Sequence, residues 1–254
     1  MRYFLRLAYN GENYCGWQMQ PNAVTVQETL NNALSLLLKE NINLIGAGRT
    51  DTGVHAKEFY AHFDTEKQYT EEERNQLIDR LNSFLPQDIV IYAIFPVEDT
   101  FHARFDAGSR TYKYYVSTQK NPFNTRFTHR VFHSLDVEKM NDACEKLLMY
   151  TDFTSFSKVH TQTKTNDCRI THARWFVEND LLVFEITADR FLRNMVRAIV
   201  GTLLEVGSGK MTIEAFCHII EQKDRSLAGV SVPAKALFLD GVGYKGLKDE
   251  KFFA

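Results

Sequence analysis

The chain has 254 residues, of which 44% are hydrophobic and 24% are charged, an ordinary globular composition that suffices for one large domain or two small ones. Its formal net charge of −2 gives no electrostatic support for nucleic acid binding. Such support must come from the positions of the cations. The four cysteines are far apart and form no C-x-x-C pair, which indicates reduced thiols. The N-terminal stretch is too short and too charged for a signal peptide, and no apolar run approaches the ~18 residues of a membrane span. We therefore expect a soluble, cytoplasmic protein with no membrane partner.

Periodicity predicts alternating strands and helices along the first part of the chain. Residues 2–8 alternate as a strand does, and the apolar residues of 26–38 fall on one helical face behind a capping Thr25. Further on, the patterns predict a strand at 57–63, a helix at 70–81 with an acidic first turn, and a strand at 88–97.

The second part of the chain resembles a repeat of the first. We predict strands at 111–118, 169–177, 181–189 and 236–244, and helices at 137–149, 192–206 and 212–221. The expected fold class is α+β, with two similar halves of mainly antiparallel sheet, helices on one face and a central cleft between the halves. The predicted halves are residues 1–100 and 101–254.

The loop GAGRTDTGVHA at residues 46–56 places Asp51 two residues from Arg49 among three glycines. Glycine allows backbone to approach a ligand closely, although a tight turn with a surface ion pair is the simpler interpretation. No Lys-Ser/Thr follows the glycines, so the loop is not a P-loop, and Asp51 occupies the third glycine position of G-x-G-x-x-G. Asp51-Thr52-Gly53 matches the D-T-G of aspartic proteases, but those enzymes need two such carboxylates and the chain has one copy. A single ionised carboxylate beside an arginine suits nucleophilic or electrostatic chemistry.

The histidines give little support for a metal site. His129 and His133 are four residues apart in a segment that looks like a strand, where that spacing separates the side chains by about 13 Å. We therefore expect no bound metal.

Two cation-rich segments favour a nucleic acid partner. FHARFDAGSRTYKYYV at 101–116 sets Arg104, Arg110 and Lys113 among aromatic rings, a pattern that suits stacked bases and phosphates as well as a half-buried strand with solvated arginines. In the predicted helix near 189–210, Arg193 and Arg197 have i, i+4 spacing and would share a face near the N-terminus. Cations there oppose the helix dipole, which favours a functional role over a solvated face.

Taken together, the chain resembles the tRNA pseudouridine synthase A family. The similar stretches run through nearly the whole chain in the family's order: YNGENYCGWQMQP (9–21), GAGRTDTGVHA (46–56), FHARFDAGSRTYKYYV (101–116), DFTSF (152–156), FLRNMVRAIVGTLLEVG (191–207) and DRSLAG followed by ALFL (224–239). The departures are Asn10, Thr52 and Ala236, which replace a usual Asp, Ala and Gly and affect no charged catalytic position.

The resemblance implies a specific activity and site. Members of this family are homodimers that use no cofactor or metal. They convert uridines at positions 38 to 40, on the 3′ side of the tRNA anticodon stem-loop, to pseudouridine. It implies that Asp51 is the catalytic aspartate, as nucleophile or sugar-proton acceptor, that Arg197 pairs with it, and that Tyr112 stacks on the substrate. The remaining candidates for substrate binding are Arg49, Arg104, Arg110, Lys113 and Arg193. The rival hypothesis is a non-catalytic RNA-binding protein of the same shape, which would have no reason to aim a carboxylate at a phosphate-rich ligand.

Overall fold

The computed structural model describes residues 1–158 and 165–247. Within these ranges the chain forms five α-helices and nine strands, and most of the strand pairs are antiparallel. The helices are α1 (Val26–Leu38), α2 (Glu71–Phe84), α3 (Val137–Leu147), α4 (Met195–Gly207) and α5 (Ile213–Gln222). The strands are β1 (Arg2–Tyr9), β2 (Ile45–Gly46), β3 (His55–Asp64), β4 (Ile89–Val97), β5 (Ala107–Ser117), β6 (His129–Arg130), β7 (Ile170–Glu178), β8 (Leu181–Ala188) and β9 (Leu237–Tyr244).

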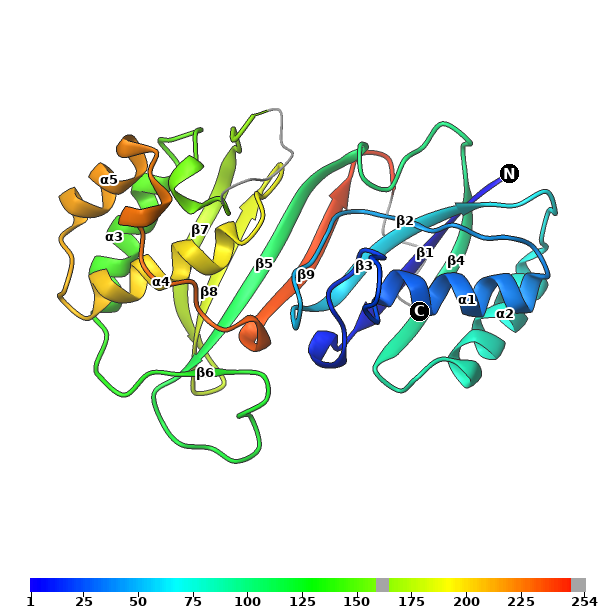
Figure 1. Cartoon of the computed structure of the whole chain (residues 1–254), viewed down its shortest axis with the longest axis horizontal. Coiled ribbons are helices and arrows are strands. Elements are labelled where there is room, and N and C mark those ends of the chain that lie inside the picture. The colour runs from blue at the N-terminus through cyan, green and yellow to red at the C-terminus, as the bar shows by residue number, and fades with distance from the viewer. Residues whose placement is uncertain (159–164, 248–254) are drawn as a thin grey trace. The chain divides into compact units, whose positions relative to one another are not determined.

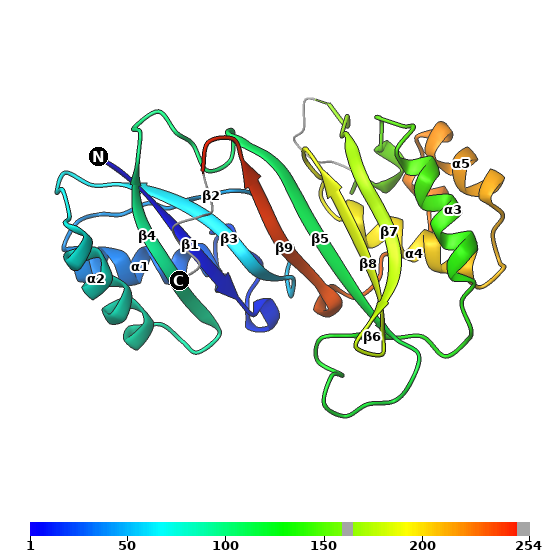
Figure 2. The ribbon, with the colours of Figure 1, turned by 180° about the vertical axis from the view of Figure 1, so that it is seen from behind.

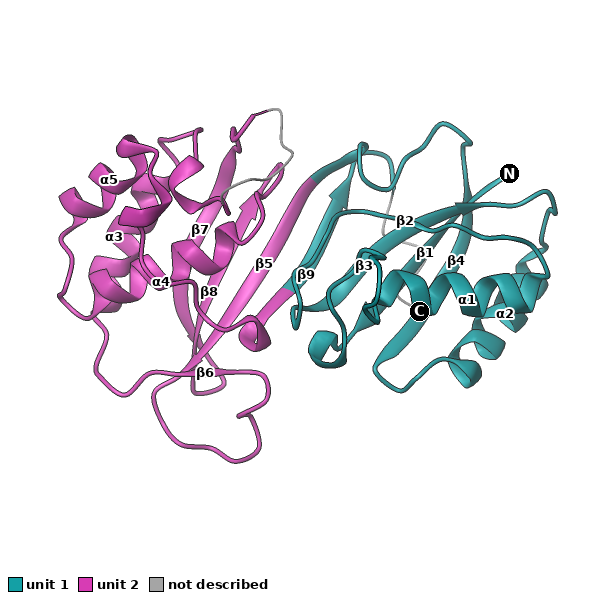
Figure 3. Ribbon diagram, in the orientation of Figure 1, with its two compact units in different colours: residues 1–108, 239–254 teal, residues 109–238 magenta. Residues whose placement is uncertain are grey.

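The chain divides into two compact units (Figure 3). Unit 1 contains residues 1–108 and the described residues from 239 onward, and unit 2 contains residues 109–238. The expected halves, 1–100 and 101–254, differ from these units chiefly at the C-terminal end, because most of β9 packs in unit 1. The cause is side-chain packing on this strand: Tyr244 contacts the rings of Phe4 and Tyr60, and its hydroxyl donates to the carbonyl of Ala103.

Unit 1 is a sheet covered on one face by two helices (Figures 1 and 2). Its strands lie in the order β4-β1-β3-β9, with β2 paired to β3, and the two views place α1 and α2 on the same side of this sheet. Thr25 caps α1 by accepting from the amide of Glu28, as predicted. Thr70 and Glu73 form a reciprocal capping box at the start of α2.

Unit 2 is built on three strands in the order β5-β8-β7, with the short β6 parallel to the end of β5. Helix α3 lies along β7, where the Asn141 side chain donates to the carbonyl of Trp175 and accepts from its amide, at 3.1 and 2.7 Å. An edge strand exposes unpaired backbone groups, and this bidentate contact satisfies two of them. No helix among the described residues is long and apolar enough to cross a membrane.

Helix α4 differs from its prediction in two ways. It begins at Met195, not at residue 192, because Asn194 adopts the left-handed conformation with φ 67°. Arg193 therefore precedes the helix, and the expectation that Arg193 and Arg197 share one helical face is wrong. The helix is also buried around most of its circumference, with Arg197 and Glu205 among its few partly exposed side chains, so its core contact is wider than the expected single stripe.

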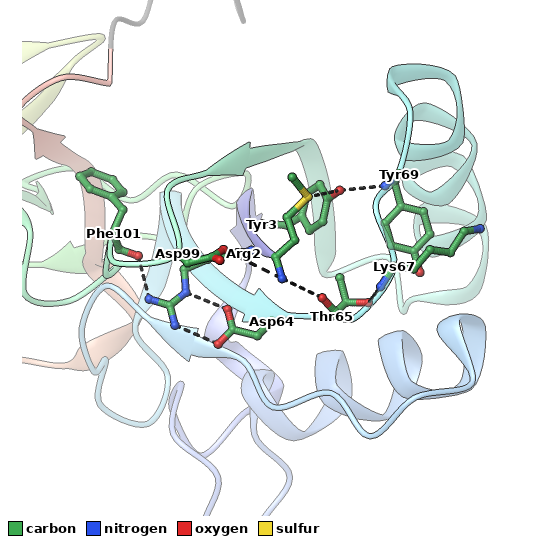
Figure 4. Close-up of polar contacts among 9 residues, drawn as sticks. Arg2, Tyr3, Asp64, Thr65, Lys67, Tyr69, Asp99 and Phe101 are labelled. Carbon is green, nitrogen blue, oxygen red and sulfur yellow. Dashed lines mark hydrogen bonds and ion pairs between the residues drawn. The ribbon is translucent and has the colours of Figure 1, made fainter.

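A network of polar contacts fixes the start of β1 (Figure 4). The Arg2 guanidinium makes two hydrogen bonds to Asp64, at 2.8 and 2.9 Å, and a third to the carbonyl of Phe101. The Arg2 amide donates to Asp99. These contacts tie the loop between β4 and β5 to the neighbouring ends of β1 and β3.

A buried histidine also contacts the loop between β4 and β5. His62 is 1% exposed and its Nδ1 accepts from the amide of Ala103 at 3.1 Å. The next histidine, His102, accepts on its own Nδ1 from the amides of Arg104 and Phe105. Both imidazoles must be neutral to accept at Nδ1, and burial lowers the pKa of His62 to about 4.

Protonation of His62 should therefore destabilise the fold at mildly acidic pH. Unfolded histidine titrates near 6.5, so the unfolded state binds a proton first as the pH falls. The free energy of unfolding should decrease from about pH 6.5 to about pH 4, by up to about 3 kcal/mol, and this contribution should level off below pH 4. Chemical denaturation across this range measures the effect.

Two variants separate His62 from other groups. His62→Asn retains an acceptor but does not titrate, so its stability should depend less steeply on pH between 6.5 and 4.5. The matched control is His133→Asn, since His133 is exposed. A His62→Asn profile parallel to the wild type would contradict the assignment.

Candidate active site

Asp51 lies in a β-turn whose geometry depends on glycine. The amide of Val54 donates to the carbonyl of Asp51 at 3.1 Å, and Gly53 has φ 76°, the sign of φ that favours glycine at this turn position. The Asp51 side chain is half-buried, whereas Thr52 beside it is exposed. The turn therefore presents one carboxylate from a fixed backbone.

A second segment, residues 11–17, runs directly against this turn. The amide of Trp17 donates to the carbonyl of Thr50, and the amide of Gly53 donates to the carbonyl of Tyr14, each at 3.3 Å. A Cβ at Gly16 would lie 2.3 Å from the Thr50 carbonyl oxygen, and one at Gly11 would lie 2.0 Å from that of Val54. Only glycine permits this approach, which explains two glycines that precede the catalytic candidate by some 40 residues.

Buried aromatic side chains pack next to the turn and the loop that precedes it. The buried hydroxyls of Tyr9 and Thr50 share a hydrogen bond of 2.9 Å. Trp17 packs on Phe59 with ring centroids 4.1 Å apart, and a Cβ at Gly46 would collide with the Trp17 ring at 2.6 Å. The first glycine of the loop therefore makes room for an aromatic ring.

The other unit 1 candidates are exposed. Arg49 follows Gly48, around which a Cβ would meet nothing within 4 Å. Arg104 lies in the loop that His62 and His102 hold, with its guanidinium 5.8 Å from the centre of the Phe105 ring. Both arginines thus lie in loops and have exposed side chains.

In unit 2, Arg197 is oriented by a carbonyl group. Its Nε donates to the carbonyl of Val232 at 2.7 Å, while the amide of Val232 donates to the carbonyl of Arg197 at 3.2 Å. Tyr114 lies close by on β5: its hydroxyl donates to the carbonyl of Pro233, and burial raises its pKa while Arg197 opposes that shift. A bond through Nε fixes the plane of the guanidinium.

The segment that supplies Val232 crosses α4 in close contact. A Cβ at Gly201 would lie 1.9 Å from the carbonyl oxygen of Val230, and the amide of Gly229 donates to the Thr202 hydroxyl. Arg225 bonds the Ser231 hydroxyl at 2.8 Å and the carbonyls of residues 228 and 229. Residues 225–232 therefore form a strap, internally braced by Arg225, that sets the position of Arg197.

The remaining candidates in unit 2 take part in several contacts. Tyr112 is half-buried on β5, with Phe191 edge-on to its ring at 5.2 Å. Arg110 donates to the carbonyl of Asp189 at 2.7 Å. Lys113 pairs with Glu185, directly opposite on β8, at 3.5 Å, so its charge is partly compensated.

Arg193 completes the set. Its side chain is exposed, and its carbonyl accepts from the amide of Lys158 at 3.1 Å. The structure thus places Arg49, Asp51 and Arg104 in unit 1 and the other site candidates in unit 2. In the described ranges no three histidine, cysteine or acidic side chains gather as a metal site would require.

Comparison with known proteins gives the site its context. The tRNA pseudouridine synthase family matches residues 7–106 and 143–245. The chain belongs to this family. It is 56% identical over 243 residues to the tRNA pseudouridine synthase A of Parabacteroides distasonis, covering 96% of each chain. It is also 56% identical to that of Bacteroides thetaiotaomicron, covering 96% of this chain and 90% of that one, and 42% identical to that of Clostridium acetobutylicum, covering 94% and 98%.

Family membership makes the chain an enzyme of the pseudouridine synthase class, which confirms the resemblance stated from the sequence. The matched ranges include Arg49, Asp51, Arg104, Arg193 and Arg197 but not Arg110, Tyr112 or Lys113. The contacts that orient the site were not predicted from the sequence. Carbonyl groups such as that of Val232 are the same at every position, so no residue pattern marks them. In the sequence, Asn10-Gly11 predicts only a turn, and the signal at Gly16 and Gly201 is limited to a glycine without an evident turn.

The Tyr9–Thr50 hydrogen bond should connect stability to activity. Thr50→Val leaves the Tyr9 hydroxyl buried without this partner, at a cost of about 1–3 kcal/mol, and should lower kcat because Asp51 is the next residue. Tyr9→Phe should destabilise by a similar amount. The double variant should cost less than the sum of the single variants, since it removes both hydroxyls that form the bond.

Denaturation and turnover measured on all three variants test this coupling. Thr52→Val is the matched control because Thr52 is exposed, and it should change neither property by much. Strict additivity of the two single effects would show that the bond does not matter.

Proposed function

We propose that this enzyme isomerises uridine to pseudouridine in tRNA, on the 3′ side of the anticodon stem-loop at positions 38 to 40. The observation that carries the proposal is a single carboxylate, Asp51, on a glycine-built turn in a chain of the tRNA pseudouridine synthase family. The direct experiment is to incubate tRNA with the protein and to map pseudouridine in the anticodon arm.

The reaction needs few chemical groups. The N1–C1′ bond of the uridine breaks, the uracil turns, and a C5–C1′ bond forms, while C5 releases a proton and N1 takes one up. The composition of the nucleotide does not change, so no redox cofactor is needed. A base paired in a stem is out of reach, so the nucleotide must be flipped out at a cost of a few kcal/mol, which contacts to the RNA must offset.

We assign the roles as follows. Asp51 acts at the sugar, as nucleophile or as the group that accepts a sugar proton. Arg197 pairs with Asp51 in the working enzyme and keeps the carboxylate ionised. Tyr112 holds the detached uracil by stacking. Arg49, Arg104, Arg110, Lys113 and Arg193 bind the RNA backbone, with Lys113 exchanging its contact to Glu185 for a phosphate.

The wider setting follows from the same resemblance. We expect a homodimer, in which two subunits share one long tRNA, acting in the cytoplasm without metal or cofactor. The similarity of the two halves and the cleft between them also remain predictions.

Asp51→Asn should abolish isomerisation and leave tRNA binding within a few-fold of the wild type, because removing a negative charge does not weaken contacts to phosphate. Essential groups of this kind contribute at least ~10²-fold to turnover. Asp79→Asn, at an exposed position of α2, is the matched control. Residual turnover within about tenfold of the wild type would remove Asp51 from the mechanism.

Substitutions of Arg197 and Arg49 should affect different kinetic constants. Arg197→Ala should reduce kcat by about 10²-fold or more and lower stability, because it also loses the bond to Val232. Arg49→Ala should raise KM with kcat retained, as expected for a binding contact. Single-turnover kinetics at saturating tRNA distinguishes the two, and the reverse pattern would make Arg49 the partner of Asp51.

Binding should weaken steeply with salt despite the net charge of −2. Each contact to phosphate contributes about 0.7 to 0.9 to the slope of log affinity against log salt concentration. Replacing Arg104 or Arg193 with Gln should lower that slope by about 0.7 to 0.9 each, which is the contribution of one contact to phosphate. A flat response of the wild type would contradict the proposed role of the cations.

A further inference from the structure

One surface of unit 2 combines exposed aromatic rings with cations and lies outside the ranges that match the family. Residues 118–134, which we call the basic loop, contain Lys120, Arg126 and Arg130, and residues 107–135 contain no aspartate or glutamate. The family match leaves out 107–142. The loop therefore carries a strong local positive charge in a chain that is slightly negative overall.

Two phenylalanine rings of the basic loop are highly exposed to solvent. Phe123 is 94% exposed and Phe132 is 81% exposed. Packing within the fold therefore buries little of either ring. The Arg130 guanidinium lies 4.6 Å from the centre of the Phe132 ring, within the range of a cation–π contact. A ring and a guanidinium in contact offer a flat cationic surface to a further ring.

The backbone of the loop is held in place by several bonds. Lys235 Nζ donates to the carbonyl of Thr125 at 2.6 Å, and the Thr128 hydroxyl donates to that of Asn124 at 3.0 Å. β6 then pairs with β5, so that Arg130 lies opposite Ser117. The rings are thus presented by an organised loop.

Beside the loop there is a hollow of about 320 Å³, at the small end of ligand sites. Arg130, Phe132 and His133 line it from the loop, and Lys210 and Glu205 line it from the end of α4 and the turn after it. His129 also lines the hollow. Among the lining residues, Glu205 supplies the one carboxylate, whereas Arg130 and Lys210 supply two positive charges.

We propose that the basic loop is a second RNA-binding surface, which takes phosphates on Lys120, Arg130 and Lys210 and stacks an unpaired base on Phe132. Cations interleaved with exposed rings are what single-stranded RNA recognition requires. Self-association through the same surface is disfavoured, because a two-fold interface would bring two patches of like charge together. This inference rests on the proposed function for the identity of the RNA.

The position of the loop fixes which part of the RNA it contacts. Arg130 lies opposite Ser117, five residues along β5 from Tyr112, or about 17 Å at the usual rise of a strand. That distance spans roughly five nucleotides at 3.4 Å each along one strand of a helix. The loop therefore contacts nucleotides remote from the uridine that Tyr112 stacks.

Paired variants test the surface without altering residues assigned to catalysis. Lys120→Gln with Arg130→Gln removes two cations from the loop, and Lys39→Gln with Arg80→Gln removes two exposed cations from unit 1 as the matched control. We expect the loop variant to bind full-length tRNA about tenfold more weakly, with kcat unchanged and the salt slope reduced by about 1.4 to 1.8. The control variant should remain within about twofold of the wild type.

A truncated hairpin whose stem ends within three base pairs of the target uridine lacks the nucleotides about five positions further along the stem, and it therefore locates the contact. The loop variant should modify it as well as the wild type does, and Phe132→Ala should likewise affect tRNA only. Unchanged binding of full-length tRNA, or an equal loss on the hairpin, would overturn the proposal. A change in sedimenting mass would also overturn it in favour of a protein interface. If the wild type neither bound nor modified tRNA, the proposed function itself would fail, which distinguishes the two.

Discussion

The close approach of residues 11–17 to the turn at 50–54 is the constraint on which the candidate site depends. Two backbone segments lie nearer than any side chain would allow, since a Cβ at Gly11 or Gly16 would overlap a carbonyl oxygen of the turn. Hydrogen bonds from Trp17 and Gly53 then cross between the segments. Because the turn is held by backbone contacts, the backbone position of Asp51 is set by the fold itself.

Unit 2 uses the same device around α4. Glycine at position 201 admits the carbonyl of Val230, and the strap thereby brings the carbonyl of Val232 to the Nε of Arg197. Replacing a helical glycine with alanine ordinarily gains helix propensity, but at Gly201 the added methyl would collide with backbone. In both units, therefore, glycine permits close backbone packing next to a charged candidate residue.

Local patterns were sufficient to predict most elements of the fold. The bounds of α1 and its cap at Thr25 agree with the sequence analysis, because apolar spacing and a side-chain cap are both local signals. The start of α4 was wrong because Asn194 adopts a left-handed conformation that a helical pattern does not reveal. The placement of β9 in unit 1 depends on contacts of Tyr244 with Phe4 and Tyr60, which are remote in sequence. The identity of Asp51 and Arg197 as candidates came from motifs, whereas the bonds that orient them involve backbone groups that no motif encodes.

The net charge of −2 and a polyanionic substrate are compatible because the acidic residues are unevenly distributed along the chain. Glu71, Glu72 and Glu73 fill the first turn of α2, where the helix dipole stabilises negative charge, and Glu28, Glu138 and Glu214 occupy the same position in other helices. Residues 107–135, by contrast, contain no acid. Six of the 32 acidic residues thus lie where they favour helix formation, while residues 107–135 carry cations without a neighbouring acid in the sequence. Since salt screens charges beyond about 10 Å, a phosphate at the basic loop responds to its local cations and only weakly to the total charge of the chain.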